Sequence, residues 1–442
     1  MSVHVDNIRR LLGSGLRNAA YLSESLGISQ STVSRALGRV GREVIRIGSG
    51  TAIQYALRDT ARGLEDVPVY RISAEGELRC LGHLMAVCPG PTGMVFQQCD
   101  GVATFYDDLP WWLDDMRPQG YLGRAYARAH GRSLGLPDDL KEWSGTHTLR
   151  ALLAHGHECV GNLLLGDFAR ERWLTLPSPV PVERHEFPGL AEGAALNGDP
   201  GSSAGGEQPK FVAYVDTPVG ARHAIVKFAG PENEVQQRWA DLLVAEHLAL
   251  ETLRDSEHSA ASTWVVDEGG YRFLVSERFD RDGERGRRAL ISLTAMDAEF
   301  VGLGGGPWPE VARRLREERR IVDDVEIQLL WAFGMMIGNT DMHFGNLSFI
   351  SEHGQPYQVA PAYDVLPMAF APRRDGTLPL EIPRVRLLPC VPTDIWRRAH
   401  WLAREYVVRL RSDERLGAGF SECIGVLDDH LADAEELLGR LS

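Results

Sequence analysis

The feature that most constrains this chain is a Gly/Ser-rich segment placed directly before two strands and a long helix. The segment GSSAGGEQPKF occupies 201–211, and apolar patterns predict strands over Phe211–Val215 and Ala224–Phe228. A helical pattern follows over Pro231–Leu253. Consecutive N–H groups of such a loop can cradle phosphates, and Lys227 can reach the same oxygens as a point charge. This order of elements predicts a nucleotide-binding half.

The loop matches neither a Walker A motif nor a GxGxxG fingerprint, so the prediction depends on its combination with the lysine. The chain has only three lysines, and two of them, Lys210 and Lys227, lie within eighteen residues of each other. An ammonium retained where arginine is otherwise used indicates a site that needs a compact charge. The pattern leaves open which glutamate pairs with this lysine, and the candidates are Glu232, Glu234 and Glu246.

The second half of the chain carries an Asp-x-x-x-x-Asn array at the end of an apolar helix. The pattern predicts this helix over Val325–Gly338, and the array consists of Asp341 and Asn346. A strand hairpin is predicted over 347–359, and Asp364 follows it. A stray Asp-x-x-x-x-Asn is common, but one followed by a hairpin and an isolated Asp is moderately specific.

These residues supply the parts that phosphoryl transfer from ATP needs. Asp341 is the candidate base for the attacking hydroxyl, while Asn346 and Asp364 are candidate ligands of Mg²⁺. Lys227 and the Gly/Ser-rich loop are the candidates that position the nucleotide. His343, counted with the catalytic residues, is expected to brace the loop that carries the base rather than to be a packed imidazole. The spacing and chain order are those of a protein-kinase catalytic loop.

Residues 1–62 predict a helix-turn-helix followed by a wing. Helical patterns cover Asn18–Leu26 and Ser29–Val40, with Gly27 at the turn, and strands are predicted over Val44–Ile47 and Ala52–Leu57. The segment has net charge +5, whereas the remainder of the chain has −19. A basic head on an acidic body indicates that the head alone binds a polyanion, namely double-stranded DNA. The outward residues expected to contact DNA are Gln30, Ser31, Thr32, Ser34, Arg35 and Arg39.

The region over 63–190 carries no chemistry that the pattern can name. Its three tryptophans are expected in the core, and three histidines between His147 and His157 lack the spacing of a metal site. A helical pattern is predicted over 122–155. The strands expected here are Val67–Ile72, Leu78–Met85, Met94–Gln98 and Val102–Tyr106.

Composition indicates a cytoplasmic protein, nucleoid-associated when it is bound to DNA. No apolar run approaches the length of a membrane span, and the N-terminus lacks the apolar core of a secretory signal. The six cysteines are scattered without a CxxC pair, which disfavours a disulfide scaffold or a zinc ribbon.

Five segments, in order, carry a resemblance: SSAGGEQPKF, IVKF, SERFDR, GNTDMHFGNLSF and APAYDVLP. Together they resemble the HipA family of bacterial serine/threonine kinases, the toxins of HipBA-type modules, over roughly 68–440. The fused helix-turn-helix resembles the single-chain HipA-like proteins of the YjjJ type. The usual family member relies on a separate HipB antitoxin for DNA binding, so the fusion leaves the antitoxin partner open.

The resemblance implies an ATP- and Mg²⁺-dependent protein kinase whose protein substrate is unknown. Asp341 would be the catalytic base, and Asn346 and Asp364 would be Mg²⁺ ligands. Glu277 and Phe279 would lie near the adenine. In the family a serine of the Gly-rich loop is autophosphorylated, which inactivates the enzyme. The matching loop residues are Ser202 and Ser203, with Gly205 and Gly206 against the nucleotide.

The expected fold is therefore α+β: a winged helix-turn-helix before a two-lobed, protein-kinase-like (HipA-like) body. The expected domains are 1–62, a HipA-like N-terminal region with the nucleotide-binding lobe over 63–280, and a mainly helical catalytic lobe over 281–442. Helix-turn-helix proteins commonly bind DNA as dimers, so a homodimer is an expectation. The DNA-binding head is expected to repress its own promoter.

Three other functions stay open at this point. The kinase-like body could sense a ligand for a transcription regulator without transferring phosphate. The Asp341, Asn346 and Asp364 set could serve a metal-dependent nuclease, although two-metal chemistry needs more clustered carboxylates. The phosphate acceptor could also be a small molecule.

Overall fold

The computed structural model divides the chain into two compact units. The first comprises 1–117 with 133–176, and the second comprises 118–132 with 177–442. The head and the region that follows it therefore share one unit. The three-domain division with boundaries at 62 and 280 stays a prediction. The structure describes residues 2–90, 92–197, 208–352 and 354–440.

The head consists of three helices and a two-stranded hairpin. Asn18 caps the second helix through Tyr21 N, Gly27 takes a left-handed φ of 62°, and Ser29 caps the third helix through Thr32 N. The first helix was not anticipated, and it adds Ile8 to the apolar core between the helices. The elements are α1 (Ser2–Gly13), α2 (Ala19–Leu26), α3 (Gln30–Val40), β1 (Val44–Ile47) and β2 (Gln54–Leu57).

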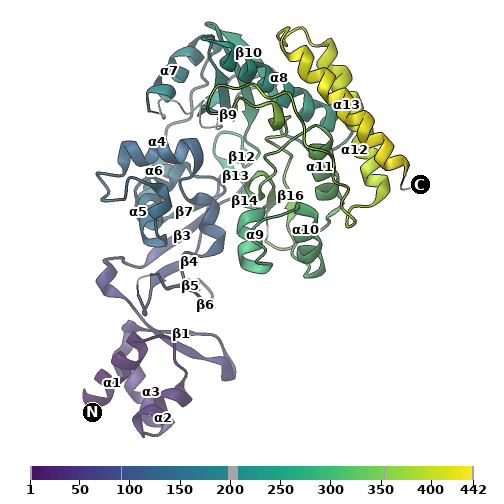
Figure 1. Ribbon diagram of the computed structural model, residues 1–442. Helices are drawn as coiled ribbons and strands as arrows, with labels where there is room; N and C mark the ends of the chain where they lie inside the picture. The colour runs from purple at the N-terminus through teal and green to yellow at the C-terminus, as the bar shows by residue number, and fades with distance from the viewer. Residues whose placement is uncertain (1, 91, 198–207, 353, 441–442) are drawn as a thin grey trace. The chain divides into compact units, whose positions relative to one another are not determined.

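The rest of the first unit is a five-stranded antiparallel sheet with two helices (Figure 1). The strand order is β6-β5-β4-β3-β7. One face of the β1–β2 hairpin packs on this sheet, because Ile45, Ile47 and Ala56 share a core with Met85 and Val95. The elements are β3 (Val67–Ile72), β4 (Leu78–Ala86), β5 (Met94–Gln98), β6 (Ala103–Tyr106), α5 (Gly145–His155), β7 (Leu163–Leu165) and α6 (Gly166–Thr175).

The helical pattern predicted over 122–155 is two helices, and they belong to different units. Helix α4 (Gly120–His130) is part of the second unit, where Tyr121 Oη donates to Ala194 O at 2.7 Å. Helix α5 returns to the first unit, capped by Ser144 and His147. Helical periodicity does not report where the chain crosses between units.

The second unit begins with a four-stranded sheet of order β10-β11-β9-β8. Because side chains alternate along a strand, Val226 and Phe228 join the apolar cluster under Phe187, whereas Lys227 between them points to the opposite face. Helix α8 packs against β9, β10 and β11. The elements are α7 (Phe187–Asn197), β8 (Lys210–Val215), β9 (Arg222–Ala229), α8 (Glu234–Asp255), β10 (Thr263–Glu268) and β11 (Tyr271–Glu277).

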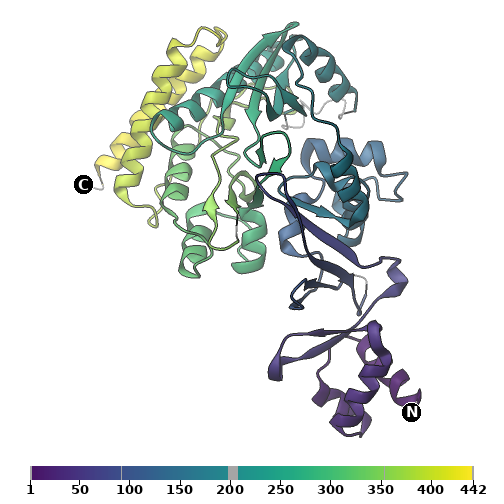
Figure 2. The ribbon, with the colours of Figure 1, turned by 180° about the vertical axis from the view of Figure 1, so that it is seen from behind.

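The remainder of the second unit is mainly helical, with a small sheet of order β14-β15-β16. Helix α12 lies beside α11, α13 and α8, as both views show (Figures 1 and 2). None of the described helices is long and apolar enough to cross a membrane. The elements are β12 (Arg281–Asp282), β13 (Gly286–Arg287), β14 (Ala289–Ser292), α9 (Leu293–Phe300), α10 (Trp308–Glu317), α11 (Val325–Met336), β15 (Ser348–Ser351), β16 (Gln358–Val359), α12 (Thr393–Ser412) and α13 (Phe420–Gly439).

Candidate active site

Lys227 is the buried centre of the candidate site. Its side chain projects from β9, and its ammonium donates to both carboxylate oxygens of Glu246 on α8, each at 2.7 Å. The same ammonium forms an ion pair with Asp364. Of the three candidate glutamates, Glu246 is therefore the partner, whereas Glu232 and Glu234 are exposed. The helix brings this pair together from positions nineteen residues apart.

The charges of this cluster hold one another ionised. Burial alone lowers the pKa of the Lys227 ammonium, but Asp364 and Glu246 overcome this effect and raise it above its ordinary value. Burial acts to raise the pKa of Asp364, but Lys227 and then Lys210 lower it to about 2. Burial raises the pKa of Glu246, and Lys227 opposes this shift. Asp364 is thus a fixed anion at neutral pH.

The backbone around Asp341 is held by two asparagine side chains. Asn339 Oδ1 accepts from Asp341 N at 3.1 Å, and Asn346 Nδ2 donates to Asp341 O at 2.8 Å. Asn339 Nδ2 also donates to Asp364 O at 3.4 Å. The Asp341 side chain is exposed. The Asp-to-Asn spacing therefore lets Asn346 close the turn that presents this carboxylate.

His343 braces the same loop. Its Nδ1 accepts from Gly345 N at 3.0 Å, which assigns the proton of the neutral ring to Nε2. Its carbonyl accepts from Trp308 Nε1 at 3.2 Å, and its ring is exposed. The imidazole thus shapes the turn after Asp341 and presents an N–H at the surface of the loop.

Asp364 has a left-handed backbone with a φ of 54°, which is uncommon for a residue with a side chain. The preceding chain is fixed because Ala261 N donates to Ala362 O at 2.9 Å and Ala362 N donates to Ser259 O at 2.8 Å. Backbone strain of this kind persists where the surroundings impose it, and here it turns the carboxylate toward Lys227.

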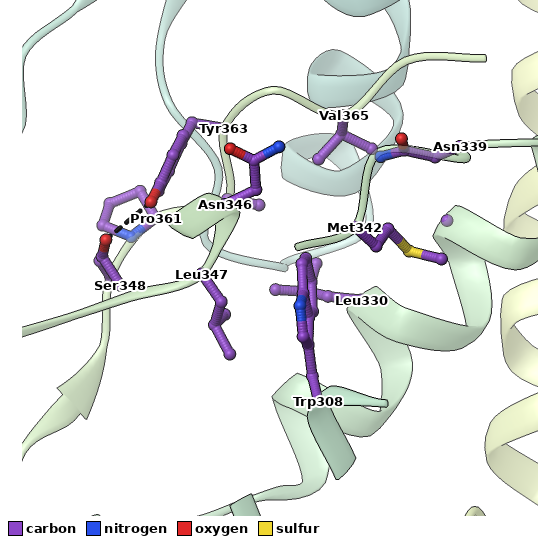
Figure 3. A pocket seen from close by; sticks show the side chains of 13 residues that line it. Trp308, Leu330, Asn339, Met342, Asn346, Leu347, Ser348, Pro361, Tyr363 and Val365 are labelled. Atoms are coloured by element: carbon purple, nitrogen blue, oxygen red, sulfur yellow. Dashed lines mark hydrogen bonds between the residues drawn. The ribbon is translucent and has the colours of Figure 1, made fainter. Parts of the chain in front are cut away.

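Tyr363 connects Asp364 to the Asp341 loop. Its hydroxyl donates to Gly345 O at 2.8 Å and lies 2.7 Å from Ser348 Oγ, the contact drawn as a dashed line in Figure 3. Its ring packs against Phe279 with a centroid distance of 5.7 Å. One side chain therefore joins the strand linker after β11 to the loop that carries the candidate base.

A narrow pocket underlies this loop, with apolar Trp308, Leu330 and Met342 on one side and Asn346 with Tyr363 on another (Figure 3). Helix α11 forms part of the lining through Gly334. A Cβ at Gly334 would lie 2.4 Å from Met342 Sδ, so glycine in mid-helix permits this close approach. The packing fixes the underside of the loop.

Comparison with known proteins identifies the family. A family model described as the YjjJ-like toxin middle domain matches residues 64–174, and one described as the HipA-like C-terminal domain matches 202–417. The chain is 38% identical to Toxin YjjJ of Escherichia coli (strain K12) over 98% of both chains. This chain belongs to the HipA-like toxin family and is of the YjjJ type.

One solved structure supports the fold. The HipA–HipB–operator DNA complex of Shewanella oneidensis MR-1 matches with a TM-score of 0.52 and 16% identity, covering 84% of this chain and 97% of that chain. The predicted HipA-like fold is therefore confirmed. A proinflammatory kinase, CtkA of Helicobacter pylori, matches with a TM-score of 0.39 and 13% identity, covering 53% of this chain and 93% of that one.

The remaining predicted residues of this HipA-like site fall into two groups. Glu277 ends β11, where its carboxylate forms an ion pair with Arg222 at 3.1 Å, and Phe279 lies half-buried beside Tyr363. Their predicted place near an adenine stays a prediction. Four predicted residues of the Gly/Ser-rich loop lie outside the described residues: Ser202, Ser203, Gly205 and Gly206.

Lys210 lies at the site although its motif alone did not mark it as a site residue. It pairs across the β8–β9 ladder with Lys227, and its charge helps to lower the pKa of Asp364 and opposes the rise that burial causes in the pKa of Glu246. Two of the three lysines therefore face one cluster. The rarity of lysine was the available signal, although it could not show the cross-strand pairing.

The predicted DNA-contacting residues lie along α3. Five of them are exposed and Thr32 is half-buried. Arg35 Nε donates to Ser31 O at 3.3 Å, and the hydroxyls of Ser31 and Thr32 lie 2.9 and 3.0 Å from Ser29 Oγ. The residues are Gln30, Ser31, Thr32, Ser34, Arg35 and Arg39. Their role in DNA binding stays a prediction.

Proposed function

We propose that this HipA-like toxin is an ATP- and Mg²⁺-dependent protein serine/threonine kinase. The observation that carries the proposal is the cluster in which Lys227 pairs with Glu246 and Asp364 while Asp341 and Asn346 stand on one braced loop. Phosphoryl transfer relies on positioning and charge stabilisation more than on covalent chemistry, and this cluster supplies both.

The donor set near Asp364 fits Mg²⁺. Mg²⁺ prefers carboxylate and amide oxygens, and the low pKa of Asp364 keeps its carboxylate ionised. Because Asn346 uses its Nδ2 on Asp341 O, its Oδ1 is left to face a ligand. Asn346 and Asp364 would hold the ion, which would neutralise charge on the phosphates. The described residues contain no cluster of three or more His, Cys, Asp or Glu for a metal, so the nucleotide's own phosphates would complete the coordination.

Lys227 and Lys210 would bind the phosphates of ATP as point charges. Glu246 would keep the Lys227 ammonium aimed at them. Asp341 would accept the proton of a serine or threonine hydroxyl of the substrate while the hydroxyl oxygen attacks the γ-phosphorus of ATP. The Nε2–H of His343 would donate to an oxygen of the transferring group, since Nδ1 is engaged with Gly345.

We further propose that α3 binds double-stranded DNA, which would allow the toxin to repress its own promoter. The support is the exposed polar face of α3 and the net charge of +5 over 1–62. The Shewanella oneidensis HipA structure contains HipB and operator DNA, which supports an antitoxin partner for this chain as well. A homodimer is proposed only because helix-turn-helix proteins commonly bind DNA as dimers. The protein would act in the cytoplasm and associate with the nucleoid through its head.

The test is the intact mass of the full chain before and after incubation with Mg-ATP, compared with Asp341→Asn. The expected result is a gain of about 80 Da per phosphate in wild type only, at Ser202 or Ser203. The starting mass must match the sequence, because protein that is already phosphorylated would gain nothing. Unmodified protein that binds ATP but transfers phosphate neither to itself nor to a cell extract would overturn the kinase proposal and favour a ligand-sensing regulator.

A further inference from the structure

Two cysteines of the first unit lie in contact although the chain has no CxxC motif. Cys80 is on β4 and Cys99 follows β5, and their Sγ atoms are 3.9 Å apart. Cys99 Sγ also donates to Cys80 O at 3.5 Å, while Cys80 Sγ donates to Gly82 O at 3.8 Å. Both are free thiols. The sulfurs need to approach by only about 2 Å to reach bonding distance.

The backbone explains why these thiols meet. The β4–β5 ladder runs from Ala86 opposite Met94 to Gly82 opposite Gln98, and Cys99 N continues it by donating to Leu81 O at 3.0 Å. The β3–β4 register shifts between Gly82 and Cys80. Cys80 is thereby displaced toward Cys99 at the end of the ladder.

The close approach at this ladder end depends on glycine. A Cβ at Gly82 would lie 2.1 Å from Gln97 O, so no other residue fits this backbone. Cys80 is thus held within β4, and Cys99, in the turn directly after β5, is tied to β4 by its backbone N–H on Leu81 O.

We propose that Cys80 and Cys99 form a reversible disulfide by exchange with a low-molecular-weight disulfide such as oxidised glutathione. Cys99 is exposed and Cys80 is half-buried, so the Cys99 thiolate attacks first and forms a mixed disulfide while one glutathione thiolate leaves. The Cys80 thiolate then attacks Cys99 Sγ and releases the second glutathione. One disulfide is reduced to two thiols while the protein dithiol is oxidised.

The pKa of the Cys80 thiol supports this order, because burial and then the contact with Cys99 raise it above its ordinary value. A thiol of this kind resists direct attack on an external disulfide but reacts with one placed beside it.

The disulfide would cross-link β4 to the end of β5, in the sheet that packs against the β1–β2 hairpin of the head. Met85 of β4 and Val95 of β5 belong to the core shared with Ile45 and Ile47. Oxidation would close a segment of about twenty residues and reduce the entropy of the unfolded first unit. The expected effect is a rise of about 6 to 12 °C in the melting temperature of that unit.

The experiment treats the reduced full chain with oxidised glutathione and maps the products without reduction. Wild type should lose about 2 Da and give one linked peptide pair containing Cys80 and Cys99. Cys80→Ser should instead accumulate a glutathione adduct on Cys99, and Cys99→Ser should give neither product. Cys88→Ser, which removes another half-buried thiol of the same sheet region, should behave as wild type.

Two results would overturn the proposal. One is wild type that keeps a glutathione adduct on Cys99 without the linked peptide. The other is a linked peptide that joins two copies of the chain through Cys99. The melting temperature is a second measurement. On oxidation it should rise equally in wild type and Cys88→Ser. A rise of the same size in Cys80→Ser would show that the Cys80–Cys99 disulfide is not its cause.

Discussion

The head and the candidate active site place their functional side chains in opposite ways. In the head, the proposed contact residues all lie on one helix of eleven residues, and all but the half-buried Thr32 are exposed. In the candidate active site, Lys227 on β9, Glu246 on α8 and Asp364 in a loop come from segments spread over 137 residues, and most of their charge is buried. Surface charge is screened by salt and tolerates substitution, whereas a buried cluster depends on each member.

The largest expected effect tests whether the active site acts separately from the head. Asp341→Asn removes the candidate base while keeping the size of the side chain. We expect phosphate transfer to fall by about 10² to 10⁴-fold, since that is the usual contribution of a general base. DNA affinity should not change. The measurement compares the autophosphorylation rate and the DNA affinity of the same preparation. A parallel loss of both would show that the active site and the head do not act independently.

The second prediction concerns the buried partner of Lys227. Glu246→Gln leaves the ammonium with Asp364 alone, and removal of one member of a buried pair costs about 3 kcal/mol of unfolding free energy. We expect phosphate transfer to fall by about 10 to 100-fold as the lysine shifts toward Asp364. Glu251→Gln, on the same helix but half-exposed beside His247, is the matched control and should retain activity. Equal losses in the two variants would refute a specific role for Glu246.

The third prediction applies the same logic to the head. Replacing Arg35 and Arg39 by alanine should weaken DNA binding by about 10 to 100-fold and reduce its dependence on salt, because phosphate or base contacts are lost. Arg79→Ala, exposed on β4 of the same unit, is the control. Phosphate transfer should be unchanged. If Arg79→Ala weakens binding as much as the double variant, α3 is not the contact surface.

A fourth prediction uses pH to measure how much the buried ion pair of Asp364 contributes to stability. The pKa of Asp364 is about 2 instead of 3.8, so its ionised form stabilises the folded state above pH 4. That contribution, roughly 2 kcal/mol, should disappear as the pH falls from about 4 to 2. Chemical unfolding of wild type and Asp364→Asn over this range measures it. The two unfolding free energies should converge at low pH, and parallel curves would contradict the ion pair.

The sequence predicted the head well because its signals are local. Asn18, Gly27 and Ser29 stand where helix caps and a tight turn are found. The strands predicted on either side of Lys227 and the helix predicted before Asp341 were placed to within a few residues for the same reason. Helix α1 was not predicted, and the pattern over 122–155 was treated as one helical region because periodicity carries no information on which unit a helix joins.

The contacts between distant segments could not be predicted. The choice of Glu246 over Glu232 and Glu234 depends on the angle at which α8 crosses the sheet, and no spacing in the sequence encodes that angle. The same holds for Lys210 beside Lys227, and for Cys80 beside Cys99, where a strand register decides the contact. Motif order predicted a chemistry, whereas the contacts between side chains are visible only in the packing.

The smallest expected effect concerns Tyr363, which joins the two parts of the active site. Tyr363→Phe removes the hydroxyl that donates to Gly345 O and contacts Ser348, while the ring can still pack on Phe279. One lost hydrogen bond is worth about 1 kcal/mol, so kcat should fall by about 3 to 10-fold. The KM for ATP should stay the same, because the residue positions the Asp341 loop rather than the nucleotide. Ser348→Ala should have a smaller effect, since the bond to Gly345 remains, and the double variant should resemble Tyr363→Phe. Losses that simply multiply, or a change confined to KM, would show that the hydroxyl does not act through the loop.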